Sequence, residues 1–354
     1  ARGLHDRPGA APPAGAGGGV LTRHDVPLAE LTTLRLGGPA RLLVEAGSEA
    51  ELVEAVTAHP AALVLGGGSN VVLPDAGLDE VVLVRSRGVE VDGDDLVVQA
   101  GEDWDALVAR TLAEGYVGLE ALSGIPGTVG AAPIQNIGAY GAEVASSVVS
   151  VRVLDRRTGQ VVELPAAECG FGYRHSLFKA EPGSRVVLAV RLRLARGSAS
   201  APVRYAELAR ALGVELGSTA PAAQVREAVL ALRRGKGMVL DPADPDSVSA
   251  GSFFTNPVVA QAPEGAPSWP ADGGVKVSAA WLIEQSGFTK GWGDGAVGLS
   301  AKHTLALVNR GGATTADLLG VARAVREGVR ARFGITLVPE PVVVGSHRDD
   351  PLTQ

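Results

Sequence analysis

The chain has 354 residues, and its 32 Lys and Arg against 39 Asp and Glu give a formal net charge of −7. This length can bury a large core and predicts two or three domains. The acidic balance argues against nucleic acid or an anionic membrane as a partner, and no apolar run approaches a membrane span. The single cysteine, Cys169, allows no internal disulfide, and the six scattered histidines predict no metal site.

Residues 1–20 are rich in Ala, Gly and Pro and lack the apolar stretch of a signal peptide, which predicts a disordered tail. Residues 30–85 then alternate strand and helix patterns, as an α/β unit does. We expect strands at 40–44, 62–65 and 81–84, and a helix that Ser48 caps and that runs to about His59. The glycine loop after the second strand lacks the G-x-G-x-x-G pattern, and a strand follows it, so it does not indicate a Rossmann fold.

Residues 86–200 predict strands with one helix at 104–114. The expected strands are two hairpins, 89–91 with 96–100 and 148–154 with 160–164, and a half-exposed strand at 186–194. Later helices are predicted at 221–234, 278–285 and 315–333. Residues 241–272 predict loops rich in Pro and Gly, and residues 335–344 predict a strand interrupted by Pro339-Glu340-Pro341.

Two glycine-rich loops are the most informative segments of the chain. The first is Gly66-Gly67-Gly68-Ser69-Asn70, and the second runs from Ser123 to Gly130 and on to Gly141. A tight turn and a surface loop are the simpler interpretations. However, three consecutive glycines exceed the needs of a turn, and residues 131–136 are too apolar for a solvated loop. Bare backbone N–H groups bind anions, so the pair predicts a ligand with more than one phosphate and a flat apolar part.

Three polar residues outside the loops each allow two interpretations. Glu340, between two prolines, is either a solvent-facing edge residue or a partly buried carboxyl that donates a proton. Arg174 either pairs with an acid or caps a helix end, or it serves a ligand. Ser252 follows a glycine and is by itself an ordinary turn serine. No G-x-S-x-G elbow is present, so the sequence gives hydrolase chemistry no support.

Seven segments together, between about residues 31 and 345, resemble the UDP-N-acetylenolpyruvoylglucosamine reductases. They are 32–38, 66–70, 123–141, 172–176, 250–257, 280–285 and 338–341. The resemblance implies an α+β chain: a two-subdomain FAD-binding fold of the vanillyl-alcohol-oxidase/PCMH type plus a smaller α+β substrate-binding domain. It places subdomain 1 at 21–85 plus 335–345, subdomain 2 at 86–240 and the substrate-binding domain at 241–334.

The resemblance also implies the reaction. NADPH reduces bound FAD, and UDP-N-acetylglucosamine enolpyruvate then takes a hydride at C3 and a proton at C2 to give UDP-N-acetylmuramate. This is a cytoplasmic step of peptidoglycan synthesis, needed for cell-wall biogenesis, cell shape and division, and a monomer is expected to act on these small molecules. The family's catalytic positions fall on Arg174, Ser252 and Glu340. Arg174 and Glu340 would polarise the substrate carboxyl and stabilise the enolate, and Ser252 would protonate C2.

Binding positions are carried over in the same way. Those for FAD are Gly66, Gly67, Gly68, Ser69, Asn70, Ser123, Gly124, Ile125, Pro126, Gly127, Gly130, Asn136, Gly138, Ala139 and Gly141. Those for the substrate are Tyr173, Tyr205, Lys236, Asn256 and Lys290. Tyr205 indicates the subtype with an extra segment whose tyrosine stacks over the substrate, and Trp269 stands where the other subtype has a tyrosine.

Residues 61–85 and 120–145 contain no His or Cys, so we expect FAD to be bound non-covalently. Two other interpretations stay open. One is another flavin oxidase or dehydrogenase of the same fold that acts on a hydroxy acid or an alcohol. The other is a non-enzymatic protein that binds nucleotide sugars, against which the joint presence of Arg174, Ser252 and Glu340 argues.

Overall fold

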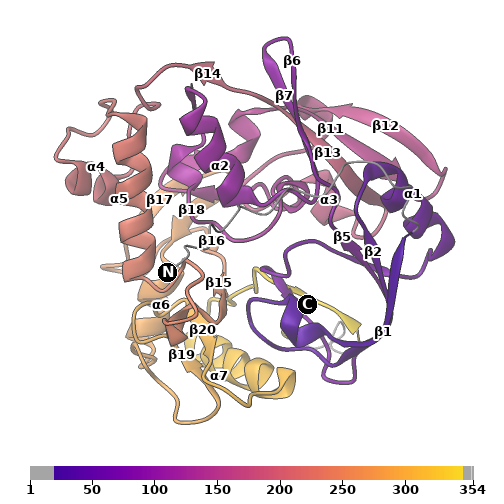
Figure 1. Ribbon diagram of the computed structural model, residues 1–354. Coiled ribbons are helices and arrows are strands. Elements are labelled where there is room, and N and C mark those ends of the chain that lie inside the picture. The colour runs from indigo at the N-terminus through magenta and orange to yellow at the C-terminus, as the bar shows by residue number, and fades with distance from the viewer. Residues whose placement is uncertain (1–19, 346–351, 353–354) are drawn as a thin grey trace, which may run out of the picture.

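The computed structural model describes residues 20–345 and Leu352, so the predicted tail lies outside the described residues except for Val20. The chain forms three lobes and a helical pair (Figure 1). The first lobe is a four-stranded sheet in the order β1-β2-β5-β3, in which β2, β5 and β3 are parallel and β1 is antiparallel. Its elements are β1 (Leu21–Pro27), β2 (Pro39–Ala46), α1 (Glu49–Ala58), β3 (Leu63–Leu65) and β5 (Leu78–Val84).

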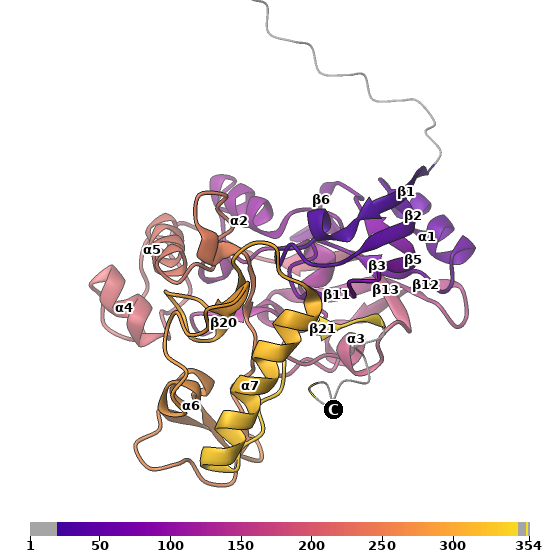
Figure 2. The same ribbon diagram turned by 90° about the horizontal axis from the view of Figure 1, so that it is seen from below.

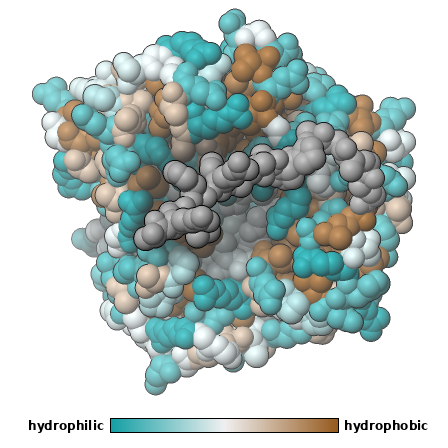
Figure 3. Space-filling model, in the orientation of Figure 1, coloured by the Kyte–Doolittle hydropathy of each residue, from teal (hydrophilic) through white to brown (hydrophobic). Residues whose placement is uncertain are grey.

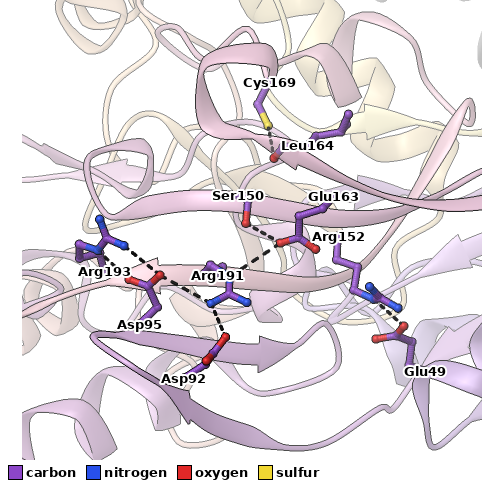
Figure 4. A network of polar contacts seen from close by, with 10 residues as sticks. All are labelled: Glu49, Asp92, Asp95, Ser150, Arg152, Glu163, Leu164, Cys169, Arg191 and Arg193. Carbon is purple, nitrogen blue, oxygen red and sulfur yellow. Dashed lines mark hydrogen bonds and ion pairs between the residues drawn. The ribbon is translucent and has the colours of Figure 1, made fainter.

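The second lobe is an antiparallel five-stranded sheet in the order β12-β11-β13-β7-β6. Its elements are β6 (Val89–Asp92), β7 (Asp95–Gln99), α2 (Trp104–Ala113), β11 (Val148–Asp155), β12 (Gln160–Pro165), α3 (Leu177–Ala180) and β13 (Arg185–Arg193). One hydrophobic core joins the first two lobes, because Ala46 and Leu52 pack in the same cluster as Val98 and Leu188. On the other face of the sheet, ion pairs link Arg191 to Asp92 and Asp95 and connect Arg152 to Glu49 of α1 (Figure 4).

The helical pair, α4 (Ala206–Leu212) and α5 (Ala222–Gly235), has a small core of its own around Leu208 and Val229. The third lobe contains two three-stranded sheets and two helices. Its elements are β15 (Ser249–Ser252), β16 (Val258–Val259), β17 (Ser268–Ala271), β18 (Gly274–Val277), α6 (Ala279–Gln285), β19 (Val297–Leu299), β20 (Ala306–Asn309) and α7 (Thr315–Phe333). None of the helices in residues 20–345 is long and apolar enough to cross a membrane.

Three two-stranded sheets and short 3-10 turns complete the described chain. The strand pairs are β4 (Val71–Val72) with β21 (Val342–Val343), β8 (Tyr116–Val117) with β14 (Ala195–Arg196), and β9 (Gly138–Ala139) with β10 (Ala142–Glu143). The 3-10 turns are η1 (Leu28–Leu31), η2 (Glu120–Leu122), η3 (Val129–Ala131), η4 (Val144–Ser146), η5 (Ala166–Glu168) and η6 (Pro245–Ser247). Because β4 directly follows the first glycine loop, its parallel pairing with β21 brings the C-terminal segment back to that loop, between α7 and the first two lobes (Figure 2).

The predicted helices and hairpins are confirmed within one or two residues at each end. The strand predicted over 335–344 is wrong except for β21, since Pro339 and Pro341 have no N–H to donate and the segment runs as a loop. The prediction of loops over 241–272 is also partly wrong, because β15, β16 and β17 form there. β15 pairs with β20, more than 50 residues later, whereas β17 forms a hairpin with β18, which directly follows it, and β16 joins the other edge of β18.

Candidate active site

One pocket brings the two glycine loops together with parts of the second and third lobes. Its wall includes residues 64–71, 125–128, 237–238 and 249–252, together with Arg174 and Glu340. The face of the molecule seen in Figure 1 is hollowed near its centre (Figure 3). The two loops and three polar residues that attracted attention in the sequence therefore meet in a single site, although they come from five separate parts of the chain.

The first glycine loop offers free backbone donors to this pocket. Within the described residues, the N–H groups of residues 66–70 donate no hydrogen bond, and the same is true of Ile125, Gly127 and Thr128 in the second loop. Gly68 has a φ of 62°, in the left-handed region that favours glycine. Successive free N–H groups around such a residue form an anion-binding concavity. The wall of the pocket therefore fits the diphosphate of FAD.

The glycines also allow the two loops to touch each other. A Cβ atom at Gly67 would lie 2.6 Å from the Cα atom of Gly127, and one at Gly127 would lie 2.8 Å from the hydroxyl oxygen of Ser69. That Ser69 hydroxyl donates a hydrogen bond to the carbonyl oxygen of Pro126, at 2.9 Å. Gly67 and Gly127 are thus needed for contact between the loops, in addition to any close approach of a ligand.

Glu340 lies at the centre of a polar network in the pocket. One of its carboxylate oxygens accepts hydrogen bonds from Nε of Arg174, at 2.9 Å, and from the side-chain amide of Gln135, at 3.2 Å. Asn70 in turn donates to Gln135, at 2.7 Å, and to the backbone carbonyl of Glu340, at 3.4 Å. The second carboxylate oxygen of Glu340 and Nη1 of Arg174 make no hydrogen bond within the described part of the chain. Both groups thus keep an atom for a ligand.

The backbone around Arg174 is strained in a way that is typical of functional sites. Arg174 has a φ of 51°, which is uncommon for a residue with a side chain. It lies in a tight turn closed by two hydrogen bonds between Gly172 and His175, and the buried amide of Asn136 donates to the carbonyl of Gly172, at 3.0 Å. Nη2 of Arg174 donates to the carbonyl of Gly138, at 2.7 Å. The guanidinium is therefore held in place from several sides.

Ser252 reaches the same pocket as the last residue of β15. The backbone N–H of Glu340 donates to the carbonyl oxygen of Phe253, at 2.8 Å, and Phe254 bridges to Pro339. These contacts place the segment of Glu340 beside the segment of Ser252. Within the described residues, the hydroxyl of Ser252 has no hydrogen-bond partner, so it is available to a ligand.

Several residues predicted to bind FAD do not line the pocket: Ser123, Gly124, Gly130, Asn136, Ala139 and Gly141. Ser123 is buried and donates to the carbonyl of Glu120, at 2.7 Å, and the N–H of Gly124 donates to Asp105, at 2.6 Å. A Cβ atom at Gly130 would lie 2.5 Å from that of Ala100. These three residues shape the second loop from behind, and Asn136 supports the turn of Arg174.

The predicted substrate-binding residues fall into two groups beside the pocket. In the first, Tyr173 lies against the ammonium of Lys276, 4.4 Å from its ring centre, and interacts with Asn256. Burial raises the pKa of the Tyr173 phenol, and Glu340 raises it further, while Arg174 and Asn256 lower it. The carbonyl oxygen of the Asn256 side chain accepts a hydrogen bond from the N–H of Ala279, at 2.9 Å.

In the second group, Tyr205 packs edge-on against Tyr140, with ring centres 5.4 Å apart. Lys236 forms an ion pair with Glu207, at 2.6 Å. Burial lowers the pKa of His303 to about 4, and the positive charges of Lys236 and Lys290 lower it as well, so both lysines lie near this ring. Apart from the ion pair of Lys236 with Glu207, this second group carries the positive charge of Lys290, which suits a ligand with phosphates.

Gln135 and Arg233 also belong to the pocket and were not predicted. Gln135 lies within the second glycine loop, but its role depends on a contact with Glu340, more than 200 residues away, which no local pattern reveals. Lys179 was not predicted either; burial lowers its pKa, whereas the neighbouring charge of Glu340 raises it.

Comparisons with known proteins identify the family and the fold of the chain. The model of the UDP-N-acetylenolpyruvoylglucosamine reductase C-terminal domain matches residues 242–344, and that of an FAD binding domain matches residues 40–165. UDP-N-acetylenolpyruvoylglucosamine reductases from Salinispora arenicola and Streptomyces avermitilis are 56% and 53% identical to this chain. These alignments cover 90% and 92% of this chain and 94% and 96% of those proteins.

A crystal structure of UDP-N-acetylenolpyruvylglucosamine reductase from Thermus caldophilus aligns with a TM-score of 0.66 and 28% identity, over 92% of this chain and 99% of that chain. The expected fold class, an FAD-binding fold with an additional C-terminal domain, is thereby confirmed. The chain belongs to the UDP-N-acetylenolpyruvoylglucosamine reductase family.

Proposed function

We propose that this chain reduces UDP-N-acetylglucosamine enolpyruvate to UDP-N-acetylmuramate, with bound FAD as cofactor and NADPH as electron donor. The observation that carries the proposal is the convergence of Arg174, Ser252 and Glu340 on the pocket that both glycine loops line. The reaction is a step of peptidoglycan synthesis, and we infer that it takes place in the cytoplasm, on a monomer. The domain division at residues 85, 240 and 334 is part of the same proposal.

Bound FAD supplies the chemistry of hydride transfer, from NADPH to C3 of the enolpyruvyl group. The free N–H groups of residues 66–70 and of the second loop would hold its diphosphate. No His or Cys occurs in residues 61–85 or 120–145, so the attachment is non-covalent.

The residues of the chain stabilise the charge that develops when C3 receives the hydride. Electron density then moves from the double bond to C2 and onto the substrate carboxylate. The free Nη1 of Arg174 donates to that carboxylate, and Glu340 and Gln135 fix the orientation of the guanidinium. Ser252 gives its hydroxyl proton to C2, which forms the new C–H bond and the saturated ether, and the serine then regains a proton from water.

Two groups beside the pocket would bind the rest of the substrate. Lys290 carries positive charge that suits its diphosphate, Lys236 lies beside it in an ion pair with Glu207, and Tyr205 offers an aromatic face, 42% exposed. Tyr173 and Asn256 border the end of the site nearest to Arg174.

The test is a pair of anaerobic half-reactions on the purified protein. We expect a yellow protein whose FAD is released by acid, is bleached by NADPH and is reoxidised by UDP-N-acetylglucosamine enolpyruvate. A hydroxy acid or an alcohol that bleaches the flavin, where NADPH does not, would favour the oxidase interpretation. A protein that binds FAD and the UDP-sugar without turnover would favour the non-enzymatic one.

A further inference from the structure

An acidic side chain lies among the residues that would bind the diphosphate of the substrate. Glu207 belongs to the first turn of α4, two positions after Tyr205. One oxygen of its carboxylate accepts a hydrogen bond from Nζ of Lys236, at 2.6 Å. This ion pair connects the start of α4 to the end of α5. The side chains of Glu207 and Lys236 are 33% and 28% exposed, so both reach solvent.

The charge of Glu207 acts on every other member of this group that titrates nearby. Burial raises the pKa of the Tyr205 phenol, and the carboxylate of Glu207 raises it further. The same charge raises the pKa values of Tyr140 and His303, although burial has the larger effect on each. The ammonium of Lys236 lies 5.6 Å from the ring centre of Tyr140. Glu207 therefore lies in the middle of the group, not at its edge.

The charges of the group do not match a diphosphate as long as the ion pair persists. Lys290 is exposed, and within the described part of the chain it forms no ion pair. Lys236 and Glu207 cancel each other, so the three side chains together leave a single positive charge. The diphosphate of a UDP-sugar carries about two negative charges at neutral pH. Two positive charges become available to it only when Lys236 is separated from Glu207.

The exchange of one anion for another is physically easy at this position. A partly exposed ion pair contributes little free energy, because water solvates both charges when they separate. The carboxylate of Glu207 can turn to solvent by rotation of its own side chain. The ion pair of Arg174 with Glu340 differs in this respect, because both side chains are more deeply buried and Gln135 also donates to Glu340. Only the pair of Glu207 and Lys236 is suited to exchange.

We propose that Glu207 competes with the diphosphate of the substrate for Lys236 and thereby sets the affinity of the site for anionic ligands. In the unliganded protein, the carboxylate holds the ammonium in place and neutralises it. The diphosphate then replaces the carboxylate, and Glu207 pairs with Lys236 again when the product leaves. This inference rests on the substrate and on its position beside Lys236 in the proposed function.

The competition makes the site selective for charge. A ligand gains from Lys236 only the difference between its own attraction and that of Glu207, so a neutral nucleoside gains nothing. Removal of the carboxylate should therefore raise the affinity for a diphosphate. If the ion pair only braced α4 against α5, its removal would lower that affinity or leave it unchanged. The two roles thus predict different changes in the same measurement.

The experiment compares Glu207→Gln with Glu215→Gln, which changes an exposed glutamate between α4 and α5. The full chain is used with its bound flavin, and UDP is the probe because it carries the diphosphate without the enolpyruvyl sugar. Calorimetric titration should show that Glu207→Gln binds UDP about fivefold more tightly than the wild type. Glu215→Gln should bind UDP as the wild type does. Glu207→Ala, which cannot accept a hydrogen bond from Lys236, should show at least the same gain.

Thermal unfolding of each flavin-loaded variant verifies that the protein titrated is folded. The proposal is wrong if Glu207→Gln and Glu207→Ala both bind UDP within twofold of the wild type, or more weakly. The ion pair would then be a brace between the two helices. A wild-type chain that does not bind UDP would instead contradict the proposed function itself.

Discussion

Glu340 is held by contacts from four parts of the chain, and its carboxylate accepts hydrogen bonds from both Arg174 and Gln135. Glu340→Gln keeps the shape of the side chain but removes its charge. We expect the variant to retain FAD and to be bleached normally by NADPH, while reduction of the enolpyruvyl sugar falls by at least ~10². The exposed Glu264→Gln is the control. Turnover of Glu340→Gln near the wild-type rate would mean that Glu340 takes no part in catalysis and is only an edge residue.

Ser252 allows the two half-reactions to be separated. Transfer of hydride from NADPH needs no proton from a serine, whereas the enolpyruvyl product needs one at C2. Ser252→Ala should therefore be bleached by NADPH at nearly the wild-type rate, and its reoxidation by the substrate should slow by ~10² or more. Ser252→Cys should recover part of the rate because a thiol is the stronger acid. Rapid mixing measures both steps, with the exposed Ser268→Ala as control. Equal slowing of the two steps would mean that another group donates the proton.

His303 should make the fold sensitive to acid. Burial, together with Lys236 and Lys290, lowers its pKa to about 4, although Glu207 acts in the opposite direction. An unfolded histidine has a pKa of about 6.5, so the unfolded state takes up the proton first as the pH falls. The contribution of the neutral ring to the free energy of unfolding is therefore complete above about pH 6.5. The free energy of unfolding then falls by about 3 kcal/mol as the pH is lowered to 4.

Denaturant unfolding at several pH values checks this expectation. In His303→Gln, the fall in the free energy of unfolding between pH 6.5 and 4 should be smaller by about that amount. Replacement of the exposed His24 by Gln should leave the pH profile unchanged. If the free energy of unfolding changes with pH equally in the wild type and in His303→Gln, then the pKa of His303 is the same in the folded and the unfolded state.

At the scale of the elements, the two glycine loops form one structure. A Val side chain at Gly67 would collide with the backbone of Gly127 and push the loops apart. We expect Gly67→Val to fold, by circular dichroism, but to lose at least ~100-fold in FAD affinity, since the free N–H groups of both loops must face the same ligand. Gly197→Val, where an added Cβ atom meets nothing nearer than 4.0 Å, is the control. Stoichiometric FAD in Gly67→Val would mean that the diphosphate binds elsewhere.

The elements that the sequence predicted are those whose signals are local. Ser48 and Asp103 cap α1 and α2 by accepting from the backbone, and the period of apolar residues marks the buried face of each helix. The course of residues 335–341 could not be predicted in this way, because the backbone N–H of Glu340 is bonded to Phe253 in another lobe. The burial of Arg233 was equally hidden, since it follows from the packing of Gly124 and Met238 around it.

The candidate site likewise combines features that local sequence reveals with features that only the whole fold determines. The glycine loops were recognisable from composition, and the roles of Arg174, Ser252 and Glu340 came from the resemblance to a family, not from their immediate neighbours. Which atoms of these residues are free depends on the whole fold. The Asn70–Gln135–Glu340 contacts, for example, join residues that are 65 and 205 positions apart.

At the scale of the whole molecule, the third lobe and the first lobe are tightly joined. Leu34, Leu36 and Val72 pack in the same core as α6 and α7. Side-chain hydrogen bonds reinforce this core. The amide of Asn309 donates to the backbone carbonyl of Leu34, at 2.9 Å, and the hydroxyl of Thr33 donates to the backbone carbonyl of Ser249, at 2.6 Å. We therefore expect a single cooperative unfolding transition for these two lobes.

Asp75 is the charged member of this connection. From the loop between β4 and β5, its carboxylate accepts hydrogen bonds from the N–H groups of Thr315, at 2.8 Å, and Ala316, at 3.3 Å, at the N-terminus of α7. A negative charge is favourable at that end of a helix, and a capping contact of this kind contributes about 1–2 kcal/mol. Asp75→Ala should lower the free energy of unfolding by that amount, and the exposed Asp79→Ala should not.

The same variant tests whether the connection matters for catalysis. Ser252 belongs to the third lobe, whereas Asn70 and the first glycine loop belong to the first, so a looser junction should disturb the substrate site more than the cofactor site. For Asp75→Ala we expect FAD affinity within twofold of the wild type and a several-fold rise in KM for the enolpyruvyl sugar. Steady-state kinetics on protein saturated with FAD, well below its melting temperature, measure this effect. If stability falls while KM and kcat stay at wild-type values, Asp75 only holds the lobes together, and the position of Ser252 is fixed by Thr33 and the bridge at Phe254.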